Sequence, residues 1–244
     1  MELELHPPLV IHESGKMRMN YEFVFPKNPI SYDQLFLIST AKTPFIGYRV
    51  PEFVGERTAF HIKENGLEKK LEGALDQATK KAAEELEDKG FNDYSFEEIS
   101  NSLGVVHVTD SEIELGWIGD CRMYHVRSHN LLFKTTDHSK IQDLQDAGAV
   151  TEVEARKHPE KNVLKRYVGN GEMQTHSLEP LKAKDYIVMA SRGIMEGVTE
   201  DQLLEILNYQ VSNLEKRNLI RNFCNSRAQG NYTMIILQVR SVEY

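Results

Sequence analysis

Short apolar runs rich in branched and aromatic side chains recur along the chain and predict β-strands. Two early runs cover residues 23–25 and 35–38, and two prolines mark the loop between them. Two later runs, residues 185–191 and 232–239, are almost continuously apolar. Such continuity is typical of strands that are buried on both faces.

Four further strand-like runs follow one another between residues 103 and 136, separated by turn residues. Their order predicts an antiparallel meander of hairpins. Gly119 and Asp120 are expected to form a tight hairpin turn between the second run and the third.

Helical patterns lie between these groups of strands. Apolar residues three or four apart predict a helix over residues 67–86, with Gly90 able to end it. Short polar N-terminal signals predict further helices. The expected helix starts are Ser139, Thr151, Thr199 and Asn213.

The predicted helices are clustered and do not alternate with single strands. This order favours an α+β fold, in which sheets are flanked by helices, over a doubly wound parallel fold. The chain shows no internal repeat, low-complexity stretch or linker, so residues 1–244 are expected to form a single domain.

Composition narrows the classes of function. The chain has 37 acidic against 29 Lys and Arg residues, a net charge of −8, and no basic stripe, so no nucleic-acid partner is expected. No run of 18 apolar residues and no signal peptide are present, so no membrane partner is expected. Cys121 and Cys224 give no disulfide framework, which favours a reducing, cytoplasmic location.

Cys121 and Arg127 have the C-x5-R spacing of cysteine-dependent phosphatases. That site needs a glycine-tolerant loop whose backbone amides surround a phosphate. The residues between them alternate like a strand and include no glycine, so we interpret the spacing as coincidental. Zinc-ligand spacings and a hydrolase nucleophile motif are also absent from the sequence.

Six segments in a fixed order carry a more specific signal. They are Gly119-Asp120-Cys121-Arg122, Asp137-His138-Ser139, Ala147-Gly148, residues 151–157, His158-Pro159 and residues 162–166. Together they resemble the type 2C, metal-dependent Ser/Thr protein phosphatase family. The resemblance implies a two-layer antiparallel β-sandwich flanked by helices, with Gly119 and Asp120 in the family's hairpin.

The resemblance also implies site residues. In this family two Mg²⁺ or Mn²⁺ ions activate a water molecule and are held mainly by carboxylates. Arg18 matches the family's phosphate-binding arginine, and Glu22 matches its metal-binding glutamate. The other expected metal positions hold different residues here, which makes the chain resemble a degenerate member. These positions are Thr40, Ala41, Arg192 and Gly230.

Arg192 changes the expected chemistry most. A unit positive charge about 4 Å from a divalent ion costs several kcal/mol at intermediate dielectric. We therefore expect no bound metal cofactor. Arg192 is expected either to pair with the remnant Glu22 or to point to solvent. Together with Arg18 it could form an anion pocket.

These expectations favour a catalytically inactive pseudophosphatase that acts in regulation by binding a phosphorylated Ser/Thr segment or another signalling protein. One alternative is an active Ser/Thr phosphatase with an atypical metal site that recruits Asp120, Asp137 and Asp185. Another is a structural module of a larger assembly, for which the apolar residues 45–60 are a candidate docking surface or simply part of the core.

Overall fold

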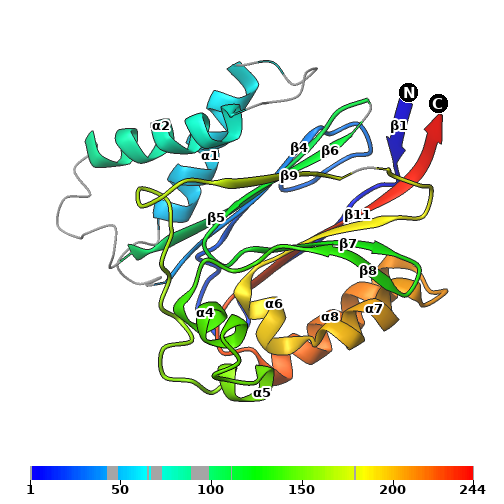
Figure 1. The fold of residues 1–244 in the computed structure, drawn as a ribbon. Coiled ribbons are helices and arrows are strands. Elements are labelled where there is room, and N and C mark those ends of the chain that lie inside the picture. The colour runs from blue at the N-terminus through cyan, green and yellow to red at the C-terminus, as the bar shows by residue number, and fades with distance from the viewer. Residues whose placement is uncertain are drawn as a thin grey trace.

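The structure, a computed structural model, describes residues 2–42, 49–64, 66, 73–88, 99–110, 112–178 and 180–243. It contains two antiparallel sheets packed face to face (Figure 1). In the six-stranded sheet the order is β1–β11–β10–β7–β8, with β2 also paired to β11. In the five-stranded sheet the order is β3–β4–β5–β6–β9.

The strand bounds of the six-stranded sheet are β1 Glu2–Leu5, β2 Leu9–Glu13, β7 Arg122–Arg127, β8 Asn130–Lys134, β10 Tyr186–Ala190 and β11 Tyr232–Glu243. Those of the five-stranded sheet are β3 Phe23–Phe25, β4 Leu35–Ala41, β5 Asn101–Val108, β6 Ile113–Ile118 and β9 Gln174–Leu178. The two chain ends lie side by side because β1 pairs with β11 (Figure 1).

Helices cover the outer face of each sheet (Figure 1). The helices α1 (Val50–Glu64) and α2 (Ala74–Asp88) share a core with the five-stranded sheet. On the other side lie α6 (Arg192–Gly197), α7 (Glu200–Asn208) and α8 (Asn213–Arg227). The short helices α4 (Lys140–Asp146) and α5 (Glu152–Ala155) lie at one end of the sandwich. The α+β class and the sandwich flanked by helices are therefore confirmed.

The continuous apolar strands are explained by burial on both faces. In β4, Phe36 and Ile38 point into the core between the sheets, whereas Leu35 and Leu37 point toward α1 and α2. The strand β10 alternates in the same way between the inner core and the core beneath α6–α8. Burying a large apolar side chain contributes about 1.5–3 kcal/mol, so each strand is fixed from two sides.

The predicted hairpin across Gly119 and Asp120 is wrong. The strand β6 pairs with β5 and β9, whereas β7 pairs with β8 and β10 in the other sheet. Gly119 and Asp120 therefore carry the chain from one sheet to the other. The turn residues are those of a hairpin, but the apolar strands on either side are drawn to different sheets, and sequence alone does not show this.

Residues 45–60 were expected to be either a docking surface or part of the core, and from Val50 onward they form the first part of helix α1. Its buried face includes Val54 and Ile62, and Gly55 lets Phe23 pack so closely that an added Cβ would lie 2.1 Å from the Phe23 ring. The segment thus belongs largely to the core. Residues 45–48, and residues 67–72 of the predicted second helix, lie outside the described residues.

The helix starts follow the predicted chemistry with small differences. Thr151 and Thr199 form complete capping boxes at α5 and α7. Ser139 caps α4, but Gln142 bonds Asp146 instead of completing the box. The last helix is capped by Ser212 and not by Asn213, which is its first helical residue. No helix in the described ranges is both long and apolar enough to cross a bilayer.

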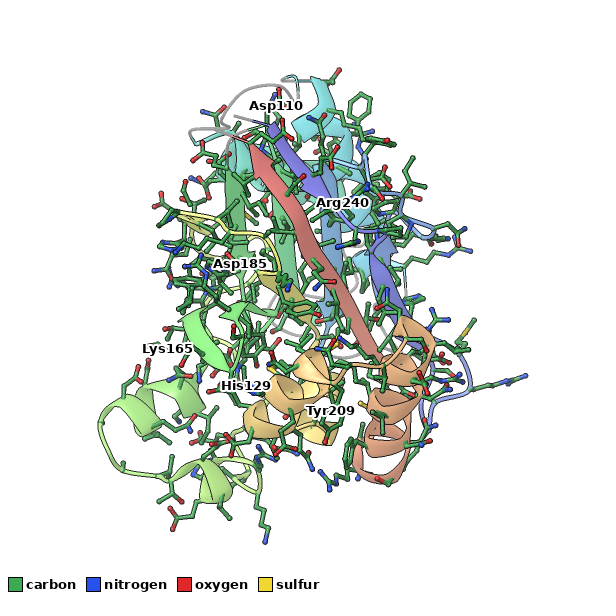
Figure 2. All side chains as sticks on the ribbon, turned by 90° about the vertical axis from the view of Figure 1, so that its right-hand side faces the viewer. Asp110, His129, Lys165, Asp185, Tyr209 and Arg240 are labelled. Atoms are coloured by element: carbon green, nitrogen blue, oxygen red, sulfur yellow. The ribbon has the colours of Figure 1, made fainter. Side chains whose placement is uncertain are left out.

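A buried carboxylate stabilises the start of β10. The Asp185 side chain is fully buried and accepts hydrogen bonds from Arg127 Nε at 2.7 Å and from His125 Nε2 at 2.9 Å (Figure 2). Arg127 Nη2 adds a third at 2.8 Å, and the Lys182 backbone amide adds a fourth at 2.9 Å. Burial by itself would raise the pKa of Asp185, but the bonds from Arg127 and His125 outweigh it and lower the pKa.

We expect Asp185→Asn to lower the free energy of unfolding by about 2–4 kcal/mol at pH 7, because Arg127 loses its buried counter-charge. A lowered pKa stabilises the fold above the unfolded value of about 3.9, and this contribution is lost as the pH falls through the folded pKa. The difference between the variant and the wild type should therefore shrink toward pH 3. Urea denaturation at both pH values measures it, with exposed Asp110→Asn as control. Equal stability at pH 7 would contradict the expectation.

Candidate functional site

A cavity of about 260 Å³ lies at one end of the sandwich. It brings together the residues that the sequence assigned to the old metal positions. These lining residues are Glu22, Thr40, Ala41, Arg192 and Gly230. They come from the start of β3, the end of β4, the start of α6 and the start of β11, elements that meet at this edge. Asp120, from the crossover between the sheets, lines it as well.

The backbone at Arg192 is fixed by close packing of the strand ends. Ser191 is the N-cap of α6, and its amide donates to the Thr233 carbonyl at 2.8 Å. Residue 193 must be glycine, because a Cβ on Gly193 would lie 1.9 Å from the Asn231 carbonyl oxygen. The Ser-Arg-Gly sequence therefore turns a buried strand into a helix against the last strand, with the Arg192 side chain facing the cavity.

Arg192 pairs with Asp120, so the predicted pair with Glu22 is wrong. Its Nη1 lies 3.2 Å from Asp120 Oδ2, and its Nε lies 3.8 Å from Glu196 Oε1. Its Nη2 donates to the Lys161 carbonyl oxygen. Arg192 is a partly buried cation held by the crossover loop and by its own helix, a position that the i,i+4 spacing to Glu196 favours.

Asp120 is itself held by a network from both sides of the crossover. Ser102 Oγ donates to Asp120 Oδ1 at 2.8 Å and accepts from the Asp120 amide at 3.1 Å. His138 Nδ1 accepts from the Gly119 amide at 3.2 Å, and its amide donates to the Gly119 carbonyl at 2.8 Å. Gly119 has φ +90°, and a Cβ there would lie 2.1 Å from Ser102 Oγ. The Asp-His-Ser segment therefore orients the carboxylate that Arg192 contacts.

Glu22 has no cationic partner among the described residues. Its Oε2 atom is buried and makes no hydrogen bond. Burial raises its pKa to about 7, and the Thr233 and Ser191 hydroxyls offset part of that rise. Near neutral pH this carboxyl is therefore divided between its acidic and ionised forms, which suits proton transfer.

The predicted anion pocket of Arg18 and Arg192 is not formed. Arg18 is exposed in the turn between β2 and β3 and lies outside the residues that line the cavity, where Met17 takes its place. Asn231 fixes this turn, because its side chain donates to the Ser14 and Met19 carbonyls, both at 2.9 Å. The turn therefore holds Glu22 at the cavity, whereas Arg18 is exposed and is not among the lining residues.

The residues at the cavity do not fit a pair of divalent metal ions. Three carboxylates line the cavity, and the oxygens of two of them, Asp120 and Glu196, face the guanidinium of Arg192. No group of three His, Cys, Asp or Glu side chains in the described part of the chain could hold a metal. The expectation that no metal cofactor is needed nevertheless stays a prediction.

The alternative metal set of Asp120, Asp137 and Asp185 is not assembled. Asp137 forms a bidentate pair with Arg122, with both contacts at 2.8 Å. Asp185 is occupied by Arg127 and His125 at the other end of β10. A working site would therefore have to rely on Glu22, Asp120 and Arg192.

Cys121 is not a nucleophile. It is buried in the core between the sheets, and burial raises the pKa of its thiol well above the usual value. A catalytic cysteine needs the opposite shift. Arg127 lies at the far end of β7 and pairs with Asp185, so the C-x5-R spacing is coincidental, as expected.

Similar proteins place the chain among known phosphatases. It is 30% identical over 138 residues to a putative protein phosphatase 2C-type of Streptococcus pyogenes, covering 54% of each chain. It is 27% identical over 143 residues to the serine/threonine phosphatase stp of Listeria monocytogenes, covering 57% of each. The chain thus spans about half the length of the curated relatives it matches. No family model matches it.

Solved structures agree on the fold. The S. agalactiae serine/threonine phosphatase superposes with a TM-score of 0.77 at 21% identity, covering 96% of this chain and 99% of that one. Stp1 from Staphylococcus aureus gives a TM-score of 0.81 at 17% identity, with 99% and 98% covered. The PstP catalytic domain in complex with two manganese ions gives 0.74 at 20% identity, with 98% and 100% covered.

These relatives correct the expectation of an inactive pseudophosphatase. They are named as a putative protein phosphatase 2C-type and a serine/threonine phosphatase, and the inference of inactivity rested on a few replaced side chains in one cavity. The comparisons therefore favour an active phosphatase.

We expect Glu22→Gln to reduce the pH dependence of stability. A carboxyl whose pKa rises from 4.5 to about 7 on folding costs stability as the pH rises through that interval, by roughly 3 kcal/mol in total. The unfolding free energy of the wild type should therefore decline more from pH 5 to pH 8 than that of the variant. Urea denaturation in EDTA measures this, and exposed Glu56→Gln is the control. Equal declines would mean that Glu22 is not the titrating group.

We expect Arg192→Asp to create a metal response that the wild type lacks, because a third carboxylate would join Glu22 and Asp120 and the opposing cation would be gone. Mn²⁺ at about one hundred times its Kd adds ~2.7 kcal/mol to a protein that binds it only when folded. Thermal unfolding with and without Mn²⁺ measures the gain. Arg192→Gln, which removes the cation alone, should show none. A saturable rise in Tm of the wild type would refute the expectation.

The ordered sequence segments, the sandwich fold and the named relatives all indicate similarity to the same group of phosphatases. The prediction made from the six linked motifs is confirmed by these independent comparisons. The chain is similar to type 2C Ser/Thr protein phosphatases, in sequence over about half of its length and in fold over nearly all of it.

Proposed function

We propose that the protein is an active phosphatase that hydrolyses phosphorylated serine or threonine side chains of a partner protein in the cavity formed by Glu22, Asp120 and Arg192. The named activity of the relatives supports this proposal. The observation that carries it is the presence, in one cavity, of a guanidinium and a carboxyl group with a pKa near 7.

Arg192 is the phosphoryl-binding group in this proposal. Its two terminal nitrogens carry four N–H groups, and the described residues accept from Nη1 and Nη2 at one atom each. The N–H groups left over can donate to phosphoryl oxygens. Arginine favours this geometry because its planar fork matches a tetrahedral oxyanion, and its charge stabilises the transferring phosphoryl group.

Glu22 supplies the proton for the leaving group. Water attacks phosphorus, the bond between phosphorus and the Ser or Thr oxygen breaks, and the protonated Glu22 carboxyl donates its proton to that oxygen. The attacking water then returns a proton to Glu22, so the balance of atoms and charge is closed. No step depends on a metal ion, since the cavity residues do not fit a metal pair.

The experiment is a phosphate-release assay with a phosphoserine peptide, carried out both in EDTA and in Mn²⁺. We expect turnover in EDTA, because the positive charge of Arg192 would stabilise the transferring phosphoryl group without a metal ion. Arg192→Gln should lower kcat/KM, while exposed Lys165→Gln should leave it unchanged. Absence of turnover under both conditions would refute the proposal, and turnover only in Mn²⁺ would refute the assigned roles.

We further expect activity to fall as the pH rises above about 7, because only the protonated form of Glu22 can donate. General acid catalysis contributes about 10²–10⁴-fold, so Glu22→Gln should lower kcat by a similar factor and abolish the alkaline limb of the pH profile. Steady-state kinetics from pH 5.5 to 9 measure both effects. A variant that keeps the alkaline limb would show that another group is responsible.

A further inference from the structure

A larger cavity of about 590 Å³ adjoins the first. The two share Asp120, Arg192, Glu196 and Gln229 in their linings, so the Arg192–Asp120 pair stands between them. The larger cavity is bounded by β7, the α4–α5 segment, α6 and the end of α8. Its volume suits several side chains of a bound peptide.

The net charge of the side chains that line this cavity is opposite in sign to the net charge of the whole chain. Seven cationic and five anionic side chains line it, an excess of two positive charges, whereas the chain carries −8. Three of the cations are neutralised by close carboxylates. Arg122 pairs with Asp137 at 2.8 Å, Lys134 with Glu200 at 2.7 Å, and Arg156 with Glu152 at 2.7 Å.

Of the other four cations, Arg192 pairs with Asp120 at 3.2 Å, whereas Lys157, Lys161 and Arg227 have no close carboxylate of their own among the described residues. Lys161 and Arg192 share Glu196, at 3.5 and 3.8 Å, and both contacts are long for an ion pair. Arg227 Nη1 bonds only neutral acceptors, the Gln202 side chain at 3.0 Å and the Gly197 carbonyl at 3.2 Å. Exposed Lys157 has no acidic side chain within ion-pair distance among the described residues.

We infer that this cavity is a subsite for a second anionic group on the substrate, next to the phosphorylated residue, with Lys157, Lys161 and Arg227 as its specificity-determining side chains. This inference rests on the proposed function. The shared ligand chemistry is an oxyanion, carried either by an Asp or Glu side chain or by a second phosphoryl group. Arg192 borders both cavities, so the two anions would lie on either side of it.

The test uses fluorescein-labelled phosphoserine peptides of the same length and the full chain in EDTA. One peptide has neutral neighbours. One series places a single Glu, and another a second phosphoserine, one to four residues to either side. Fluorescence anisotropy gives Kd, and phosphate release gives kcat and KM separately. The double variant Lys157→Gln, Arg227→Gln removes two cavity charges. Its control is Lys165→Gln combined with Lys140→Gln, which removes two exposed charges outside the cavity lining; Lys165 is labelled in Figure 2.

We expect one Glu position to tighten binding about two- to fivefold, since a partly exposed ion pair is worth up to ~1 kcal/mol. The second phosphoserine should tighten it roughly tenfold, because its nearly doubled charge can engage two of the cations. The cavity variant should lose this preference and the control should keep it, and 0.5 M salt should weaken it. A preference that is absent, or that survives in the cavity variant, would overturn the subsite. A preference without turnover would retain the subsite and refute only the proposed function.

Discussion

Face-to-face packing of two sheets, each also covered by helices, is the constraint on which the rest of the molecule depends. A strand such as β4 or β10 has no solvent face, so polar residues can gather only where the strands end. Glu22, Thr40 and Arg192 all stand at such ends. The cavity is therefore a product of the sandwich, and its side chains are positioned by the rigid strands that precede or follow them.

The electrostatics of the cavity follow from that placement. The crossover between β6 and β7 brings Asp120 to Arg192, and α6 brings Glu196 to the same guanidinium. Both carboxylates are thereby balanced without any added ion. Glu22 lies deeper, receives no such partner and responds with a raised pKa. The cavity thus contains one buried acid without a cationic partner and one cation shared by two carboxylates, among the described residues.

Much of the fold could be predicted from the sequence, because burial on both faces produces apolar runs that local patterns show directly. The wrong predictions concern local structures that depend on tertiary contacts. The turn at Gly119 has hairpin chemistry, yet the strands on either side join different sheets. The helix α1 contains a glycine and aromatic residues of low helix propensity, and burial of Val54 and Ile62 against the sheet offsets this.

The candidate site could also be predicted only in part from the sequence. Motif order correctly brought Glu22, Thr40 and Arg192 into one cavity. It did not show which acid Arg192 would meet, because the distance between side chains on separate strands depends on the crossover loop. Glu196, four residues after Arg192, was the local signal that was missed. The replaced residues alone were therefore not enough to infer inactivity. They show that the expected set of carboxylates is lost. They do not show that the fold brings other charged side chains to the same cavity.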